Sequence, residues 1–172
     1  MKGKVAAIAE NLKSFQDEIV GIVSLPLEVQ HSNYDYVLHR KLFENTRGYM
    51  LQVVDQINLC YEHTCYDACA VMIRRLIEIL IIETYDKYNI ESEICDSDNN
   101  FFFLDELISR FISASHWKIG RNTKSGLKKL KTIGDQSAHS RRYNAKRSYI
   151  DTVAQDLRVV TEELLYLSGL RK

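Results

Sequence analysis

The spacing of apolar residues constrains the fold of this chain more than any other feature of its sequence. Near the C-terminus, apolar side chains recur at intervals of three and four residues, at Ile150, Val153, Leu157, Val160, Leu164 and Leu167. That spacing places them on one face of a helix, and its regularity resembles a coiled-coil seam. The alternation of period two that indicates a strand does not extend over a useful length anywhere. The sequence therefore predicts an all-α fold.

The same spacing predicts helices elsewhere in the chain. We expect them over residues 4–23, 40–62, 65–88, 101–115, 123–132 and 145–167. The segment 65–88 is the most apolar and is expected to form the central core helix. Residues 24–39 read as a connector, 96–100 as a turn, and Gly134 as a helix breaker. At helix ends, Thr64 and Asn144 are candidate N-caps and Gly169 is a candidate C-terminal stop.

Composition supports one helical domain. The chain has 172 residues, a single proline and seven glycines. Sandwiches and barrels need more turns than these residues supply, and the length suits one domain with its own core. We expect residues 1–172 to form one domain, a bundle of five or six helices.

Nothing in the sequence indicates secretion, a membrane span or a metal. Glu10 interrupts the apolar run of the N-terminus, and charges interrupt the apolar stretch 71–82. The four cysteines are expected to be free thiols, because no second ligand pair completes a zinc site. The expectation is a cytoplasmic protein with no membrane contact, no metal and no cofactor.

Charge is divided along the chain although the total is neutral. Residues 118–147 hold ten basic residues and one acid, a net charge of +9, and the remainder holds 13 basic and 22 acidic residues, a net charge of −9. A concentrated basic segment favours contact with a polyanion such as RNA or DNA, although a solvated face is the simpler interpretation. The candidate nucleic-acid-binding residues are Lys124, Lys128, Lys129, Lys131, Arg141, Arg142, Lys146 and Arg147.

Three places carry side chains suited to chemistry. Arg74 and Glu78 lie four residues apart and can pair on one face of the core helix, at its edge or at a buried polar site. His139 has the side chain best suited to proton transfer, and arginines beside it can stabilise phosphate charge, but a lone histidine is more often structural. Trp117 among cations can stack on a base or close the core beneath a loop. Phosphate loops, nucleophile elbows and paired-carboxylate motifs are absent from the sequence.

Two segments resemble signatures of HEPN-like bacterial proteins. Residues 66–78, which end in Arg74-Arg75-Leu76-Ile77-Glu78, resemble the Arg-Arg-x-Leu-Glu helix of a branch often found near restriction and abortive-infection genes. Residues 130–139 resemble the Gly-Asn/Asp-x-x-Ala-His junction of that branch. The resemblance covers about residues 52–170 and implies a HEPN-like core over 41–172, with 1–40 as an uncovered N-terminal helix and connector.

The resemblance also implies roles for individual residues. Active HEPN ribonucleases use an arginine, a polar residue and a histidine, usually across a dimer and without metal. His139 matches the histidine and Asp135 the polar position, but Gly134 occupies the place of the arginine. Arg74, Arg141 or Arg142 can substitute only if the fold brings one near His139. The candidate catalytic residues are therefore His139, Arg74, Glu78 and Asp135.

These observations lead to three hypotheses about function. The first is a non-catalytic HEPN-like module of a bacterial defence system that binds nucleic acid or a partner protein. The second is a metal-independent ribonuclease, as in a toxin–antitoxin pair, that uses His139. The third is a structural subunit whose basic segment docks on the acidic region 62–106 of another chain, with the seam of the last helix as a possible dimer interface.

Overall fold

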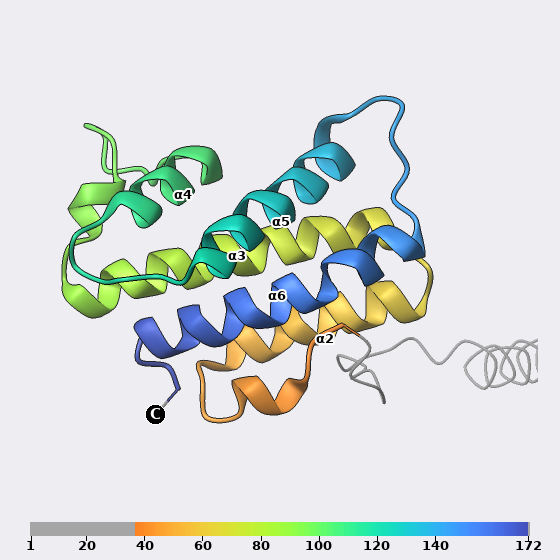
Figure 1. The fold of residues 1–172 in the computed structure, drawn as a ribbon, viewed down its shortest axis with the longest axis horizontal. Helices are drawn as coiled ribbons and strands as arrows, with labels where there is room; N and C mark the ends of the chain where they lie inside the picture. Colours follow the sequence, from red (N-terminus) through yellow and green to blue (C-terminus); the bar gives the residue numbers. More distant parts are fainter. Residues whose placement is uncertain (1–36, 172) are drawn as a thin grey trace, which may run out of the picture. The chain divides into compact units, whose positions relative to one another are not determined.

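The computed structural model describes residues 37–171, and within them every regular element is a helix (Figure 1). Five α-helices follow one another: α2 (Gly48–Glu62), α3 (Tyr66–Tyr88), α4 (Leu104–Ser113), α5 (Arg121–His139) and α6 (Arg147–Leu167). Two short 3₁₀ helices, η1 (Arg40–Phe43) and η2 (Glu91–Ile94), precede α2 and follow α3. An isolated bridge joins Cys95 and Phe101, and residues 37–171 contain no strand. The all-α prediction is confirmed, and the helix predicted over 4–23 lies outside the described residues.

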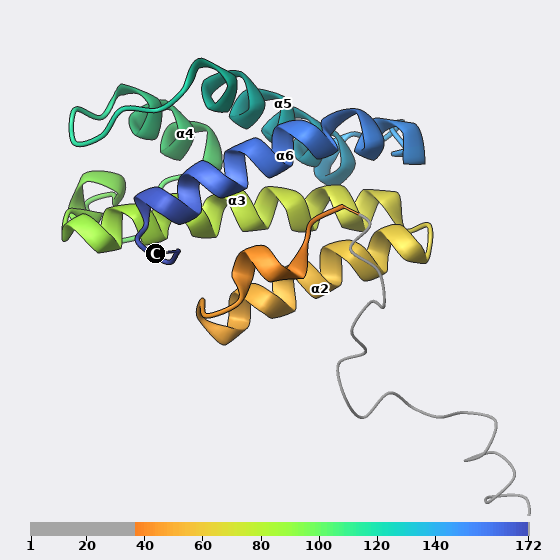
Figure 2. The same ribbon diagram turned by 60° about the horizontal axis from the view of Figure 1, so that its bottom comes forward.

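The helix α3 is the centre of this bundle, as its apolar sequence predicts. It contacts α2, α4, α5 and α6, and Figure 2 shows α2 and α5 on opposite sides of it. Its inward residues, among them Ile73, Leu76, Ile77 and Leu80, are fully buried. Within the described residues, no helix is both long and apolar enough to cross a lipid bilayer.

The regular seam of α6 belongs to the core of the same chain. Ile150, Leu157, Val160 and Leu164 are completely buried, and Val153 is nearly so. Because this face packs against α3 and α5, it is not available as a dimer interface. Of the two uses that the spacing allows, the structure supports the intramolecular one.

A side chain of α6 also holds the start of α5. The carboxylate of Glu163 accepts a hydrogen bond from the backbone N–H of Gly120 at 2.8 Å and a second one from the Thr123 hydroxyl. Gly120 occupies the N-cap position of α5, and a glycine has no side chain that can cap the helix. A carboxylate from another helix therefore binds the N-cap residue and the first turn of α5 and places negative charge beside the positive end of this helix.

Several helix boundaries differ from the predictions. The helix predicted from residue 40 is interrupted, since Asn45 adopts a left-handed conformation between η1 and α2. Thr64 is also left-handed and is not a cap, because Cys65 occupies the N-cap position of α3. Lys146, not Asn144, precedes α6. The prediction for Gly169 is confirmed: it follows α6 with φ of 66°, a conformation that glycine adopts without strain.

Candidate functional site

Gly134 does not break its helix, contrary to the prediction. The helix α5 runs through it to His139 because the glycine lies directly against α3. A Cβ atom at this position would meet Arg74 Cβ at 2.6 Å and the Ala70 carbonyl oxygen at 3.1 Å. The absence of a side chain therefore lets two helices approach closely, which outweighs the weak helix propensity of glycine. The arginine of active HEPN ribonucleases has no room at this position.

The close approach brings Arg74 to the residue after Gly134. Arg74 Nε donates to Asp135 Oδ1 at 2.8 Å, and its Nη1 lies 3.7 Å from Glu78 Oε2. Lys131 binds the other Asp135 oxygen at 2.7 Å and also lies 3.1 Å from Asp105 of α4. The ion network of Arg74, Glu78, Lys131, Asp135 and Asp105 thus joins α3, α5 and α4. It contains the predicted pair of Arg74 and Glu78.

The network fixes the charge state of its central carboxylate. Partial burial on its own raises the pKa of Asp135, but hydrogen bonds from Lys131 and Arg74 outweigh burial and leave that pKa below its ordinary value. The hydrogen bonds from Lys131 to Asp135 and Asp105 raise the pKa of the Lys131 ammonium in turn. Asp135 is therefore an ionised acceptor at neutral pH and has no proton to give as a general acid.

His139 stands apart from this network. It is the last residue of α5, and its side chain is exposed and makes no hydrogen bond or ion pair with any described residue. Asp135 lies one helical turn before it, so the two share a face of α5. Arg74, however, is shared by two carboxylates, and a guanidinium neutralised in this way is a poor partner for a phosphate. The structure thus brings together three of the four candidate catalytic residues, Arg74, Glu78 and Asp135, but not His139.

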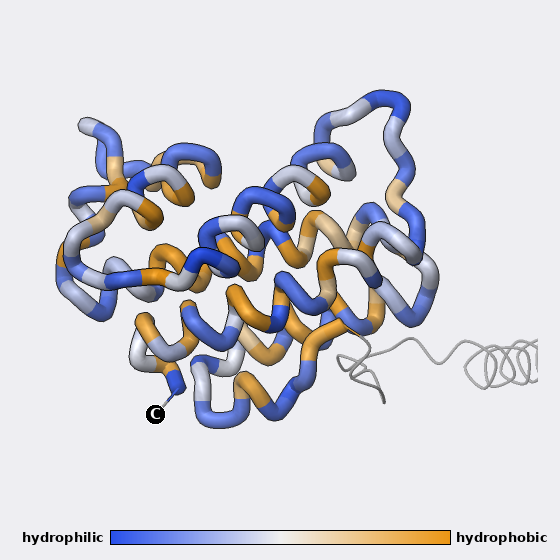
Figure 3. Tube along the Cα trace, in the orientation of Figure 1, coloured by the Kyte–Doolittle hydropathy of each residue, from blue (hydrophilic) through white to orange (hydrophobic). Residues whose placement is uncertain are grey.

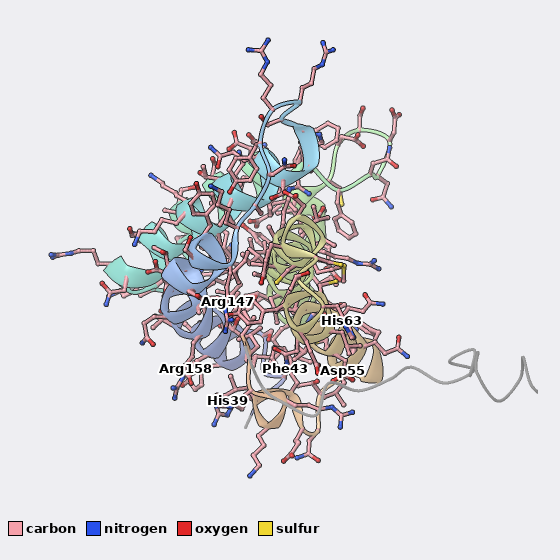
Figure 4. The ribbon with its side chains drawn as sticks, turned by 90° about the vertical axis from the view of Figure 1, so that its right-hand side faces the viewer. His39, Phe43, Asp55, His63, Arg147 and Arg158 are labelled. Carbon is pink, nitrogen blue, oxygen red and sulfur yellow. The ribbon has the colours of Figure 1, made fainter. Side chains whose placement is uncertain are left out.

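The ten cations of the basic segment fall into two groups. Lys129 is paired with Asp156 at 2.8 Å, and Lys131 belongs to the ion network. Arg147 Nε donates to the Tyr61 hydroxyl at 3.0 Å and lies 3.9 Å from Asp151; Figure 4 labels Arg147. The other seven have no acidic group within 4 Å among residues 37–171: Lys118, Arg121, Lys124, Lys128, Arg141, Arg142 and Lys146.

Six of these seven are exposed and lie in two places, the first half of α5 and its connection to α6; we call them together the basic face. Arg121, Lys124 and Lys128 follow at intervals of three and four on the exposed side of α5, and Arg141, Arg142 and Lys146 occupy the connection to α6. Figure 3 shows that this connection is largely hydrophilic. Arg121 was not among the predicted binding residues, although its spacing from Lys124 and Lys128 marks it as a member of their stripe.

Trp117 is part of the core and does not face a ligand. Only 8% of its surface is exposed, and its indole N–H donates to the Phe111 carbonyl at 3.1 Å. Its ring meets Tyr85 edge to face with centroids 5.0 Å apart. Of the two interpretations of this tryptophan, closure of the core is confirmed.

Neither the family models nor the curated proteins nor the solved structures provide a match to this chain. The basic face and the ion network therefore have to be interpreted from their own chemistry.

Proposed function

We propose that this chain is a non-catalytic HEPN-like module that binds nucleic acid through the basic face. The observation that carries the proposal is the six exposed cations without acidic partners among the described residues. A phosphate backbone presents negative charge at regular intervals, and each contact with lysine or arginine releases condensed counterions. At ~1.5 Å per residue, α5 extends ~27 Å from Arg121 to the connection that carries the other three cations, a distance that several phosphates can occupy.

The chemistry of the basic face favours affinity over sequence discrimination. Lysine and arginine contacts to phosphate position a nucleic acid but read no base. Binding by such a surface is strongly salt-dependent and tolerates many sequences. The bacterial defence setting is part of the proposal only through the two segments that resemble HEPN-like signatures.

The arrangement around His139 supports binding rather than cleavage. A metal-independent ribonuclease needs a cation near its histidine to stabilise the charge of the transition state. Arg74 contacts Asp135, one turn of α5 before His139, but is engaged by Asp135 and Glu78. Arg141 and Arg142 follow His139 closely in the sequence, and we assign them to phosphate binding.

Two adjacent lysines allow a matched test. Lys128 belongs to the basic face, whereas Lys129 is paired with Asp156, and replacing either by glutamine removes one positive charge. We expect Lys128→Gln to weaken binding of a labelled oligonucleotide in fluorescence anisotropy and to lower the salt slope, d log K/d log[salt], by about 1. Lys129→Gln should have a much smaller effect. The double variant R141Q/R142Q should lower the slope by about twice as much as Lys128→Gln.

Several results would overturn this proposal. Absence of oligonucleotide binding at low salt is one, and a salt-independent affinity is another. Equal losses for Lys128→Gln and Lys129→Gln would show that only net charge matters. If an acidic protein binds the basic face and oligonucleotides do not, the face is a protein-docking surface, as the alternative of a partner protein predicts.

A further inference from the structure

A shallow apolar hollow lies beside the basic face, between α5 and α6. It has a volume of about 260 Å³. Its lining residues are Ile133 and Gln136 of α5, Tyr143 of the connection, and Tyr149, Thr152 and Val153 of α6. Pockets for drug-sized ligands measure roughly 300–1,000 Å³, so this hollow suits a single planar ring system better than an extended molecule.

The hollow results from the way in which α5 is held at two separate points. Near its start, Gly126 lies so close to α6 that a Cβ there would meet Val160 Cγ2 at 2.7 Å. Near its end, Gly134 holds α5 against α3 instead. The helices α5 and α6 therefore diverge toward their connection, as Figure 1 shows. The hollow occupies the space that this divergence opens.

Two tyrosines form an aromatic pair in the wall of the hollow. The rings of Tyr143 and Tyr149 are stacked, with centroids 6.0 Å apart and planes inclined by 23°. Tyr149 is 41% exposed, so the pair is accessible to a third ring. Neither hydroxyl makes a hydrogen bond with another described residue, which leaves both hydroxyls able to bind polar groups of a ligand.

The connection that carries Tyr143 is held in place at both ends. The Ser140 N–H donates to the Gln136 carbonyl at 3.0 Å, and the Ala145 N–H donates to Asp67 Oδ1 of α3 at 2.9 Å. Tyr143 therefore has a fixed place between Arg142 and Lys146. Aromatic rings beside cations match the two parts of a nucleotide, a flat base and a charged phosphate.

We propose that this hollow is a stacking site for one unpaired base of a single-stranded nucleic acid whose phosphates lie on the basic face. The inference rests on the proposed function and adds the kind of nucleic acid. A base inside a duplex is stacked on both of its faces and cannot enter the hollow unless it is first extruded. A base of a single strand can stack on Tyr149 at no such cost.

The test compares tyrosine variants on single-stranded and duplex oligonucleotides of the same sequence. Tyr149→Ala removes one base stack and should therefore weaken binding of the single strand about fivefold or more, as measured by fluorescence anisotropy. Tyr149→Phe should retain the affinity, because the ring and not the hydroxyl supplies the stacking. Tyr166→Ala is the matched control: Tyr166 is also on α6, is 75% exposed, and does not line the hollow. Duplex binding should be unchanged by all three substitutions.

A second variant closes the hollow without removing either tyrosine. Thr152 is an exposed lining residue, and Thr152→Leu fills part of the space with an aliphatic side chain. It should weaken single-strand binding and leave duplex binding unchanged. Circular dichroism of each variant separates loss of the site from loss of the fold.

The outcomes distinguish this inference from the proposed function. If R141Q/R142Q weakens binding but Tyr149→Ala and Thr152→Leu bind the single strand as the parent does, the basic face binds nucleic acid and the stacking site is wrong. If Tyr149→Ala weakens duplex binding equally, the tyrosine acts on both forms and the stacking site is again wrong. If the parent binds no oligonucleotide, the proposed function fails and this inference fails with it.

Discussion

Two parts of the same side of α5 carry similar charged residues and hold them in opposite ways. In its second half, where α5 meets α3 and α4, Lys131 and Arg74 share the carboxylates of Asp135, Asp105 and Glu78. In its first half, Arg121, Lys124 and Lys128 have no acidic partner among the described residues. The first arrangement joins three helices, whereas the second leaves charge available to a ligand. Composition alone does not distinguish them, because both contribute to the same +9 segment.

The largest effect should come from Gly134, which permits the close contact of α5 with α3. Gly134→Ala places a Cβ only 2.6 Å from Arg74 Cβ, so we expect the free energy of unfolding to fall by about 1–3 kcal/mol in urea titration. Gly134→Arg should cost more, because no arginine fits between the two helices. The larger loss would show that this chain cannot adopt the arginine of active HEPN ribonucleases without repacking.

Gly48→Ala is the control for this experiment. Gly48 is the first residue of α2, and nothing lies within 4 Å of the Cβ that alanine would add. That substitution should be neutral or stabilising by up to about 1 kcal/mol. An unchanged stability of Gly134→Ala would contradict the close approach of α5 to α3.

A smaller effect, dependent on pH, should follow from the central carboxylate. Asp135→Asn removes the acceptor that Arg74 and Lys131 share, and we expect a loss of about 1 kcal/mol at pH 7, since the network is only partly buried. The pKa of Asp135 is lowered in the folded state. Its contribution is therefore complete above the ordinary aspartate pKa of about 3.9 and is lost as pH falls through the folded value.

The measurement is the difference in unfolding free energy between parent and Asp135→Asn at a series of pH values. The difference should shrink as the pH falls below about 4. Asp98→Asn is the control, because the Asp98 side chain is exposed and makes no ion pair with a described residue. A difference that stays constant from pH 7 to strongly acidic pH would show that the charge of Asp135 is not what stabilises the contact.

Local spacing in the sequence is enough to predict several helices and one contact of the ion network. Helical periodicity identifies α3 and α6 closely, and a separation of four residues predicts the contact of Arg74 with Glu78. Gly134 was misread because its local propensity for breaking helices was outweighed by packing against α3, a contact across 60 residues of sequence. The bond from Arg74 to Asp135 is equally distant in sequence and has no local signal.

Local spacing also does not show which cations have an acidic partner and which remain able to bind a ligand. Lys128 and Lys129 are adjacent and chemically identical, yet only Lys129 meets Asp156 of α6. Which of them is paired depends on the rotation of α5 against α6, and long-range packing sets that rotation. The hollow with Tyr143 and Tyr149 was missed for the same reason, since it arises from the divergence of two helices.

The smallest effect should come from His139, which lies beyond the ion network at the end of α5 and belongs to neither group. His139→Ala should change the free energy of unfolding by no more than about 0.5 kcal/mol, because an exposed side chain without partners loses little on truncation. Treatment of RNA with parent and variant in EDTA should give the same products, since Arg74 is held by Asp135 and Glu78. His116→Ala, at an exposed histidine 3.3 Å from Glu93, controls for removal of an imidazole. If the parent cleaves RNA in EDTA and only His139→Ala loses that cleavage, the ribonuclease hypothesis is correct. The cation that assists it would then have to come from outside the ion network.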